Sequence, residues 1–169
     1  NEVRKISEKL DIKLNIGFIS NTQGQAETAY EAIKLLEEND HDILKNSPIA
    51  FHNGDTILIN RNLDKISKIM EESKYMGVID TFESNSKNFS YLQVNDRGIV
   101  KKIIEKRVIS NKATSGFYVF SNKKIYKEFY SKVDFAKKEI FISDVYEKLI
   151  MSNLKVYNVH NTNPKETIV

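Results

Sequence analysis

Cysteine is absent from the 169 residues, which excludes disulfide bonds and thiolate catalysis and agrees with a cytoplasmic location. No apolar run approaches the ~20 residues of a membrane-spanning helix, and the first residues lack a signal-peptide pattern. Repeats, low-complexity stretches and Pro/Gly-rich linkers are missing as well. The net charge is only +3, with lysines and glutamates interspersed, as in "KKIIEK". We therefore expect neither a membrane span nor a nucleic-acid-binding surface.

Apolar residues make up 40% of the chain, enough to form one core in a single domain over residues 1–169. A period of two places Leu14, Ile16 and Phe18 on one side of a strand at 13–20. The patterns predict further strands at 48–51, 75–82, 116–120 and 154–159, helices at 26–38, 63–70 and 143–150, and a hairpin around "NDRG" at 95–98. This alternation predicts an α/β sandwich with a mostly parallel sheet, to which the hairpin adds an antiparallel part.

The segment "FHNGDTILIN", residues 51–60, carries an acidic residue just beyond an apolar strand. In open α/β sheets, ligands bind beyond the carboxyl ends of the strands. Gly54 allows a close backbone approach, and Asp55 could hold Mg²⁺, which takes one or two carboxylates with phosphate oxygens and water. A turn in which Asp55 bonds its own backbone explains the same residues. Both interpretations stay open.

A second acidic candidate is Asp144 in "EIFISDVYEKLI", where an apolar stretch passes into a helix. An acid at that position is normally a helix cap. Ser143 could serve as the cap instead and leave Asp144 for other work. Asp55 and Asp144 could then share one divalent cation, although their separation in sequence does not show that they meet.

Two loops could contact phosphorylated groups. In "NTQGQAETAYEAI", Gly24 lies between Gln23 and Gln25, before a helix whose first N–H groups favour an anion or the acceptor edge of a base. A tight turn explains the same glycine. In "IIEKRVISNKATSGFYVF", Glu105 could accept hydrogen bonds from hydroxyls and Lys106 could meet a phosphate. A surface ion pair is the alternative there.

Taken in order, "TQGQAETAYEAI", "NGD", "EK", "SNKATSGFYVF" and "ISDVYEKLI" resemble the sugar-nucleotidyltransferase (nucleotide-sugar pyrophosphorylase) family over nearly the whole chain. The resemblance implies a Rossmann-like, glycosyltransferase-A-type mixed sheet sandwiched by helices. It also implies an enzyme that joins an NTP (CTP, dTTP or UTP) to a sugar 1-phosphate, releasing pyrophosphate with the help of Mg²⁺. Such enzymes commonly make donors for bacterial surface polysaccharides, including capsules.

Carried over by position, the resemblance implies that Asp55 and Asp144 hold the metal and that Lys106 contacts the acceptor phosphate, these three forming the catalytic set. The implied nucleotide-binding residues are Gln23, Gly24, Gln25, Asn53 and Gly54. The implied substrate-binding residues are Glu105, Lys106, Gly116 and Tyr91. No general base is needed, because the second pKa of a phosphate is about 6, and the task is to bring two polyanions into line.

Two features depart from the family pattern. The opening glycine-rich loop with its arginine is missing, and "NPKETIV" stops early, so we expect an excerpt of a longer chain that does not turn over alone. Ser90-Tyr91 stands where sugar-specific members have Tyr-Gly, with the glycine against the sugar. A cytidylyltransferase acting on a non-sugar phosphate, such as an alcohol or amine phosphate, is therefore the main alternative. Tyr91 facing the other side of its strand would explain the departure equally well.

Other functions stay open as well. "DHD" at 40–42 matches the Asp-x-Asp metal motif of glycosyltransferases, but it precedes a strand and is typical of a solvated loop. A non-catalytic relative that binds a nucleotide is a third alternative. Tyr126, Phe129 and Tyr130 at helical spacing predict a packing face, with a homodimer through that face left open.

Overall fold

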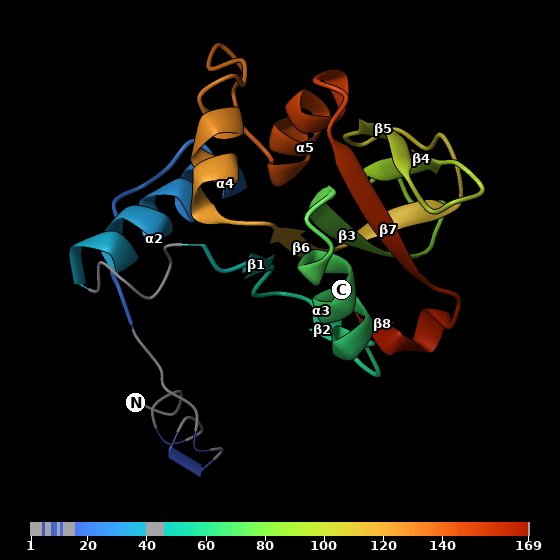
Figure 1. The fold of residues 1–169 in the computed structure, drawn as a ribbon, viewed down its shortest axis with the longest axis horizontal. Helices are drawn as coiled ribbons and strands as arrows, with labels where there is room; N and C mark the ends of the chain where they lie inside the picture. Colours follow the sequence, from blue (N-terminus) through green and yellow to red (C-terminus); the bar gives the residue numbers. More distant parts are fainter. Residues whose placement is uncertain (1–4, 6–7, 10, 12–15, 40–45, 169) are drawn as a thin grey trace.

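A mixed six-stranded sheet forms the centre of the computed structural model, which describes residues 5, 8–9, 11, 16–39 and 46–168 (Figure 1). The strand order is β5-β4-β6-β3-β7 with β1 beside β6, and β2 and β8 form a separate two-stranded sheet. None of the described helices has both the length and the apolar character needed to cross a bilayer. The strands are β1 (Ile49–His52), β2 (Ile57–Leu58), β3 (Tyr75–Glu83), β4 (Tyr91–Val94), β5 (Val100–Ile104), β6 (Lys112–Phe120), β7 (Lys155–Asn161) and β8 (Thr167–Ile168). The helices are α2 (Gln25–Asn39), α3 (Leu63–Glu71), α4 (Lys123–Tyr130), α5 (Ile142–Met151) and the 3-10 helix η1 (Pro164–Glu166).

Helices cover both faces of the sheet because the central strands bury both sets of alternating side chains. Ile79 and Tyr118 pack in the same cluster as α2, α4 and α5. Their neighbours Val78 and Val119 point the other way and pack with α3. In Figure 1, α4 and α5 lie above the sheet and α3 lies below it. The expected α/β sandwich is confirmed.

The strand directions differ from the mostly parallel sheet that the sequence predicted. β3 pairs with β7 in parallel, whereas every other described pairing of the sheet is antiparallel. The reason is the position of β6, which lies between β1 and β3 and runs against both. β1, β3 and β7 therefore still point the same way, and their carboxyl ends share one edge of the sheet.

The strand predicted at 13–20 is wrong for its described part. Residues 16–22 form no helix or strand, and the side chain of Phe18 is 91% exposed. Leu14 lies outside the described residues, as does the "DHD" segment at 40–42. A period of two produces a strand only where a neighbouring strand supplies hydrogen bonds, and residues 16–20 have no such partner in the described part of the chain.

The aromatic face of α4 packs against α2 of the same chain. The hydroxyl of Tyr126 donates to the carbonyl of Ala26 at 2.7 Å, and Tyr130 stacks on Tyr30 with ring centroids 4.6 Å apart. Burial raises the pKa of Tyr130 to about 12. The predicted packing face is confirmed, and it holds the first turn of α2 against the body of the domain.

Candidate active site

Asp55 lies just beyond the carboxyl end of β1, in a turn attached to the neighbouring strand. The N–H of Asn53 donates to the carbonyl of Gly116 on β6 at 3.0 Å, and the N–H of Thr56 donates to the carbonyl of Asn53 at 3.4 Å. The Asp55 carboxylate is exposed, and its only hydrogen bond within the described part of the chain comes from the Thr56 hydroxyl at 3.4 Å. The turn therefore presents a carboxylate that is free to take an external ligand.

Two cavities meet at this turn. The first, the α2 cavity, has a volume of about 720 Å³ and lies between the start of α2 and the end of β1. The second, the Lys106 cavity, has a volume of about 380 Å³ and is bounded by Glu105 and Lys106. Gln25, Asn53 and Asp55 line both. The site can thus hold two ligands side by side, with one carboxylate between them.

The loop before α2 is fixed by backbone contacts with the segment before α5. Gly24 has a φ of +124°, and a Cβ atom there would lie 2.7 Å from the carbonyl oxygen of Ile140. That carbonyl accepts a hydrogen bond from the N–H of Ala26 at 3.0 Å. The side chain of Gln23 donates to the carbonyl of Phe135 at 3.1 Å and lines neither cavity, whereas Gly24 lines the α2 cavity. Of the three residues of this loop predicted to bind the nucleotide, Gly24 and Gln25 line the α2 cavity, whereas Gln23 ties two loops together.

Glu105 and Lys106 follow β5, and they present one carboxylate and one ammonium group to the Lys106 cavity. Glu105 accepts hydrogen bonds from the hydroxyls of Ser143, at 2.7 Å, and Ser90. Lys106 has a φ of +52°, and its Nζ lies 4.5 Å from the ring centroid of Phe141. Lys106 forms no ion pair within the described part of the chain, so its ammonium group is available to an anion in the cavity.

Asp144 occupies the first turn of α5, where both of its carboxylate oxygens have partners. One accepts from the ammonium of Lys137 at 2.6 Å and the other from the N–H of Phe141 at 2.8 Å. The hydrogen bond to Asp144 raises the pKa of Lys137. Asp144 is 6% exposed and lines neither cavity, although the next residue back, Ser143, contacts Glu105. This arrangement is that of a capping residue; metal binding by Asp144 stays a prediction.

Tyr91 does not line either cavity. It is fully buried, its hydroxyl donates to the carbonyl of Ser86 at 2.7 Å, and its ring packs with Phe82. The structure therefore does not place Tyr91 where it was predicted to contact a substrate. It agrees with the alternative, in which the ring faces the other side of β4. The preceding residue, Ser90, lines the Lys106 cavity instead. Strand alternation could have identified Ser90, because adjacent side chains point to opposite faces.

Sequence reasoning also missed Phe141, whose ring closes the Lys106 cavity beside Lys106. No motif marks this phenylalanine, because it reaches the site through the packing of α5. Of the residues predicted for the site, the structure places Gly54 on the α2 cavity and Gly116 on the Lys106 cavity. Gly116 was expected to leave room for a ligand, but the atoms that its Cβ would meet belong to Asn53.

Replacement of Gly116 by alanine is expected to destabilise the protein by about 2 kcal/mol or more, because the residue has a left-handed backbone and no room for a Cβ atom. Its φ is +82°, and a Cβ would lie 2.7 Å from the Nδ2 atom of Asn53. Thermal unfolding measures the change, expected as a drop of roughly 4 °C or more. Gly54→Ala is the matched control, since no atom lies within 4 Å of its added Cβ. Equal melting temperatures for the two variants would contradict this account.

Comparisons with known proteins identify the fold and the family of the chain. The chain aligns over 95–99% of its length with two solved proteins. One is the nucleoside-diphosphate-sugar pyrophosphorylase from Vibrio cholerae RC9, with a TM-score of 0.83 and 24% identity; the chain covers 69% of it. The other is a proposed glucose-1-phosphate thymidylyltransferase from Bacillus anthracis, solved with a sucrose, with a TM-score of 0.73 and 15% identity; the chain covers 63% of it. At these identities the likeness shows a shared fold, and no curated protein sequence matches the chain significantly. The profile of the family described as Nucleotidyl transferase matches residues 1–163, so the chain belongs to the nucleotidyl transferase family.

Proposed function

We propose that the protein transfers a nucleotidyl group from an NTP to a phosphorylated small molecule, with a sugar 1-phosphate as the first candidate acceptor. The observation that carries the proposal is the meeting of the α2 and Lys106 cavities at Asp55. A reaction between two phosphorylated substrates needs two adjoining sites with a charge-neutralising centre between them. Family membership supports the same class of reaction.

The reaction balances without a general base. A phosphate oxygen of the acceptor attacks the α-phosphorus of the NTP and forms a new P–O bond. The bond from that phosphorus to the bridging oxygen of the β-phosphate breaks, and pyrophosphate leaves with the electron pair. The attacking phosphate is largely ionised at pH 7, so the protein's task is to align two anions and offset their charge.

The residues that line the two cavities suit an NTP in one and a phosphorylated acceptor in the other. The NTP would lie in the α2 cavity, against Gln25 and the loop at Gly24. The acceptor phosphate would meet Lys106, whose ammonium is unpaired among the described residues. Glu105 already accepts two hydroxyl hydrogen bonds at Oε2, while Oε1 has no hydrogen-bond partner among the described residues and could accept one from the acceptor.

A magnesium ion is the cofactor that this chemistry implies, and Asp55 fits it best. Mg²⁺ is commonly held by one or two carboxylates together with substrate phosphates and water, and the exposed Asp55 carboxylate meets that need. When bound, the ion offsets phosphate charge. Asp144 would have to release Lys137 before it could contribute an oxygen. No group of three or more acidic or histidine side chains in the described part of the chain could hold a metal alone, so substrate phosphates would complete the coordination.

An acceptor screen with the full-length protein tests the proposal. Each NTP is incubated with Mg²⁺ and either sugar 1-phosphates or alcohol and amine phosphates, and pyrophosphate release is measured. We expect release that depends on one acceptor class, with a reaction lacking acceptor as the control for simple hydrolysis. Activity with alcohol or amine phosphates and CTP alone would identify a cytidylyltransferase of non-sugar phosphates. A folded protein that releases no pyrophosphate with any pair would refute nucleotidyl transfer.

A further inference from the structure

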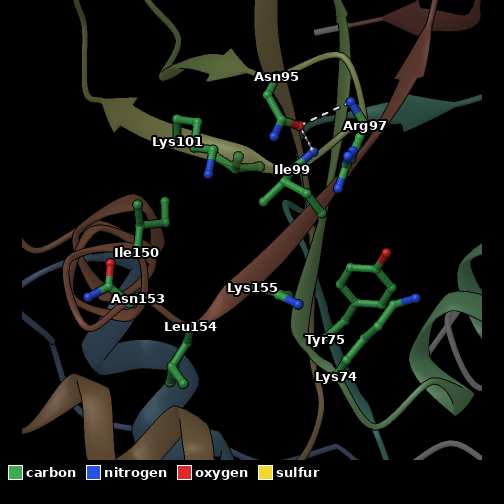
Figure 2. Close-up of a pocket in the computed structure, with 11 residues that line it drawn as sticks. Lys74, Tyr75, Asn95, Arg97, Ile99, Lys101, Ile150, Asn153, Leu154 and Lys155 are labelled. Carbon is green, nitrogen blue, oxygen red and sulfur yellow. Dashed lines mark hydrogen bonds between the residues drawn. The ribbon is translucent and has the colours of Figure 1, made fainter.

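A third cavity, the basic cavity (Figure 2), lies at the amino ends of β3 and β7. Asp55 lies at the other end of these strands, beyond the carboxyl end of β1. The basic cavity is bounded by the β4–β5 hairpin, by the amino ends of β3 and β7, and by the end of α5. Its volume is about 490 Å³, within the usual range for small-molecule sites. It shares no lining residue with the α2 cavity or the Lys106 cavity. It is therefore a separate candidate site.

The lining of the basic cavity is strongly positive. Four cationic side chains line it, Lys74, Arg97, Lys101 and Lys155, and no described carboxylate does. Lys74 is paired with Glu72. The other three form no ion pair within the described part of the chain. Figure 2 shows Arg97 coming from the hairpin and Lys155 from the start of β7, and both line the cavity. Three uncompensated charges around one cavity favour an anion between them.

A β-bulge brings Lys101 into this lining. Val94 pairs with Val100, whereas the preceding residue Gln93 pairs with Lys102, so Lys101 is an extra residue in β5. In a regular strand the side chains of Val100 and Lys101 would point to opposite faces. Both line the basic cavity. Bulges commonly redirect a side chain at a binding site, and here the redirected group is a cation.

The hairpin that carries Arg97 and Lys101 is held in place. Asn95 accepts hydrogen bonds at Oδ1 from the N–H groups of Arg97, at 3.1 Å, and Ile99, at 2.9 Å. The carbonyl of Gly98 accepts from the N–H of Asn158 on β7 at 2.9 Å. The backbone that carries Arg97 and Lys101 is therefore positioned before any ligand arrives, which lowers the entropic cost of binding.

The end of α5 does not account for the nearby cations. Basic residues often interact with the unpaired carbonyls at a helix C-terminus. Here backbone N–H groups already bond those carbonyls: Ser152 to Lys148 at 3.1 Å, and Leu154 to Leu149 at 3.1 Å. Lys155 is thus not required as a cap.

We propose that the basic cavity binds a small molecule bearing a diphosphate group or two phosphates, held by Arg97, Lys101 and Lys155. One phosphate carries a charge of about −1.5 to −2 at pH 7, so three cations match more than one phosphate. Arginine supplies paired N–H donors and lysine a point charge, the usual combination for phosphate oxygens. Tyr75 and Leu154 add an apolar wall against which an organic part could rest. The proposal stands independently of the reaction at Asp55.

Residue-resolved NMR titration of the full-length protein tests the proposal, with inorganic phosphate, inorganic pyrophosphate and UDP as probes. Amide signals of residues 97–101 and of Lys155 are expected to shift with pyrophosphate or UDP, with about tenfold or tighter affinity than for phosphate. If UDP binds more tightly, the ligand is an organic diphosphate; if pyrophosphate does, it is the free anion. Shifts near Gln25 and Asp55 report the other site separately. Shifts confined to that site would overturn the proposal.

Single variants locate the binding. Arg97→Gln, Lys101→Gln and Lys155→Gln each remove one cation from an exposed side chain, so the fold is retained, and each is expected to weaken pyrophosphate binding by about tenfold. Lys102→Gln is the matched control, because Lys102 is exposed on the same strand and does not line the cavity. Equal weakening by the control, or none by the three variants, would show a diffuse surface charge and not a site.

Discussion

Replacement of Asp55 by asparagine is expected to lower pyrophosphate release by about 100-fold or more, because the variant loses the carboxylate proposed to hold Mg²⁺ between the two substrates. The melting temperature should stay within roughly 1 °C of the wild type, since the side chain is exposed. Among the described residues, its only hydrogen bond is the 3.4 Å contact from the Thr56 hydroxyl. Steady-state kinetics and thermal unfolding of the same preparation measure both effects.

Two further variants show whether the effect of Asp55→Asn is specific to that carboxylate and whether Asp144 also holds the metal. Asp64→Asn removes an exposed carboxylate from α3, on the other face of the sheet, and should leave turnover unchanged. Asp144→Asn breaks the ion pair with Lys137, so we expect lower stability; its affinity for Mn²⁺, used in place of Mg²⁺, tests the metal role predicted for Asp144. If Asp144→Asn weakens Mn²⁺ binding as much as Asp55→Asn does, both aspartates hold the metal. Full activity of Asp55→Asn would remove the centre of the proposed reaction.

Replacement of Arg61 by methionine is expected to destabilise the protein by about 3–5 kcal/mol, because it leaves a buried carboxylate without its charged partner. Arg61 donates through Nε to Asp80 Oδ2 at 2.8 Å, and the Asp80 side chain is fully buried. The guanidinium also bonds the carbonyl of Glu166 at 3.1 Å and the hydroxyl of Thr167, which ties the β2–β8 sheet to β3. Denaturant unfolding measures the loss, and Lys65→Met, at an exposed position on α3, is the control.

The pH dependence of this loss has a definite sign. Burial raises the pKa of Asp80 above its ordinary value of 3.8, opposed by the Ser115 hydroxyl and the Arg61 charge. A carboxyl whose pKa is higher folded than unfolded favours the fold at acid pH, and that contribution is lost as the pH rises through the folded pKa. Removing Arg61 raises the folded pKa further. The deficit of Arg61→Met against wild type should therefore shrink as the pH falls from about 7 towards 4.5.

A double variant completes the test of this ion pair. Arg61→Met with Asp80→Asn removes both charges, so no buried carboxylate is left without a partner. We expect it to recover at least half of the stability lost in Arg61→Met, as is common when both partners of a buried pair are replaced. An additive loss in the double variant would show that the two side chains stabilise the fold independently.

Local periodicity was sufficient for most elements of this fold. Ala26, Ala29 and Ile33 recur at helical spacing, and all three are buried on one side of α2. The wholly apolar run at 48–51 predicts a buried strand; β1 is found there, but Ile49 is its one buried residue. Such patterns work because the core accepts only one face of a helix or strand, and that face sets the period.

The position of the candidate site, at the carboxyl ends of the strands, was partly predictable from the same local patterns. Asp55 and Glu105 each lie beyond a strand, and Gln25 starts a helix, so all three were expected at loops where ligands bind. The structure brings them to adjoining cavities. Which neighbour each side chain meets was not predictable, because Lys137 reaches Asp144, and Ser90 and Ser143 reach Glu105, only after distant segments pack.

Local spacing and composition were enough to predict the class of fold, the alternation of helices and strands, and the chemical types of residue at the strand ends. Three features required the tertiary structure: β6 runs antiparallel between β1 and β3, Tyr91 turns into the core, and Lys101 lines the basic cavity. Each of these depends on hydrogen-bond register between segments remote in sequence, and a shift of one residue in register moves a side chain to the opposite face.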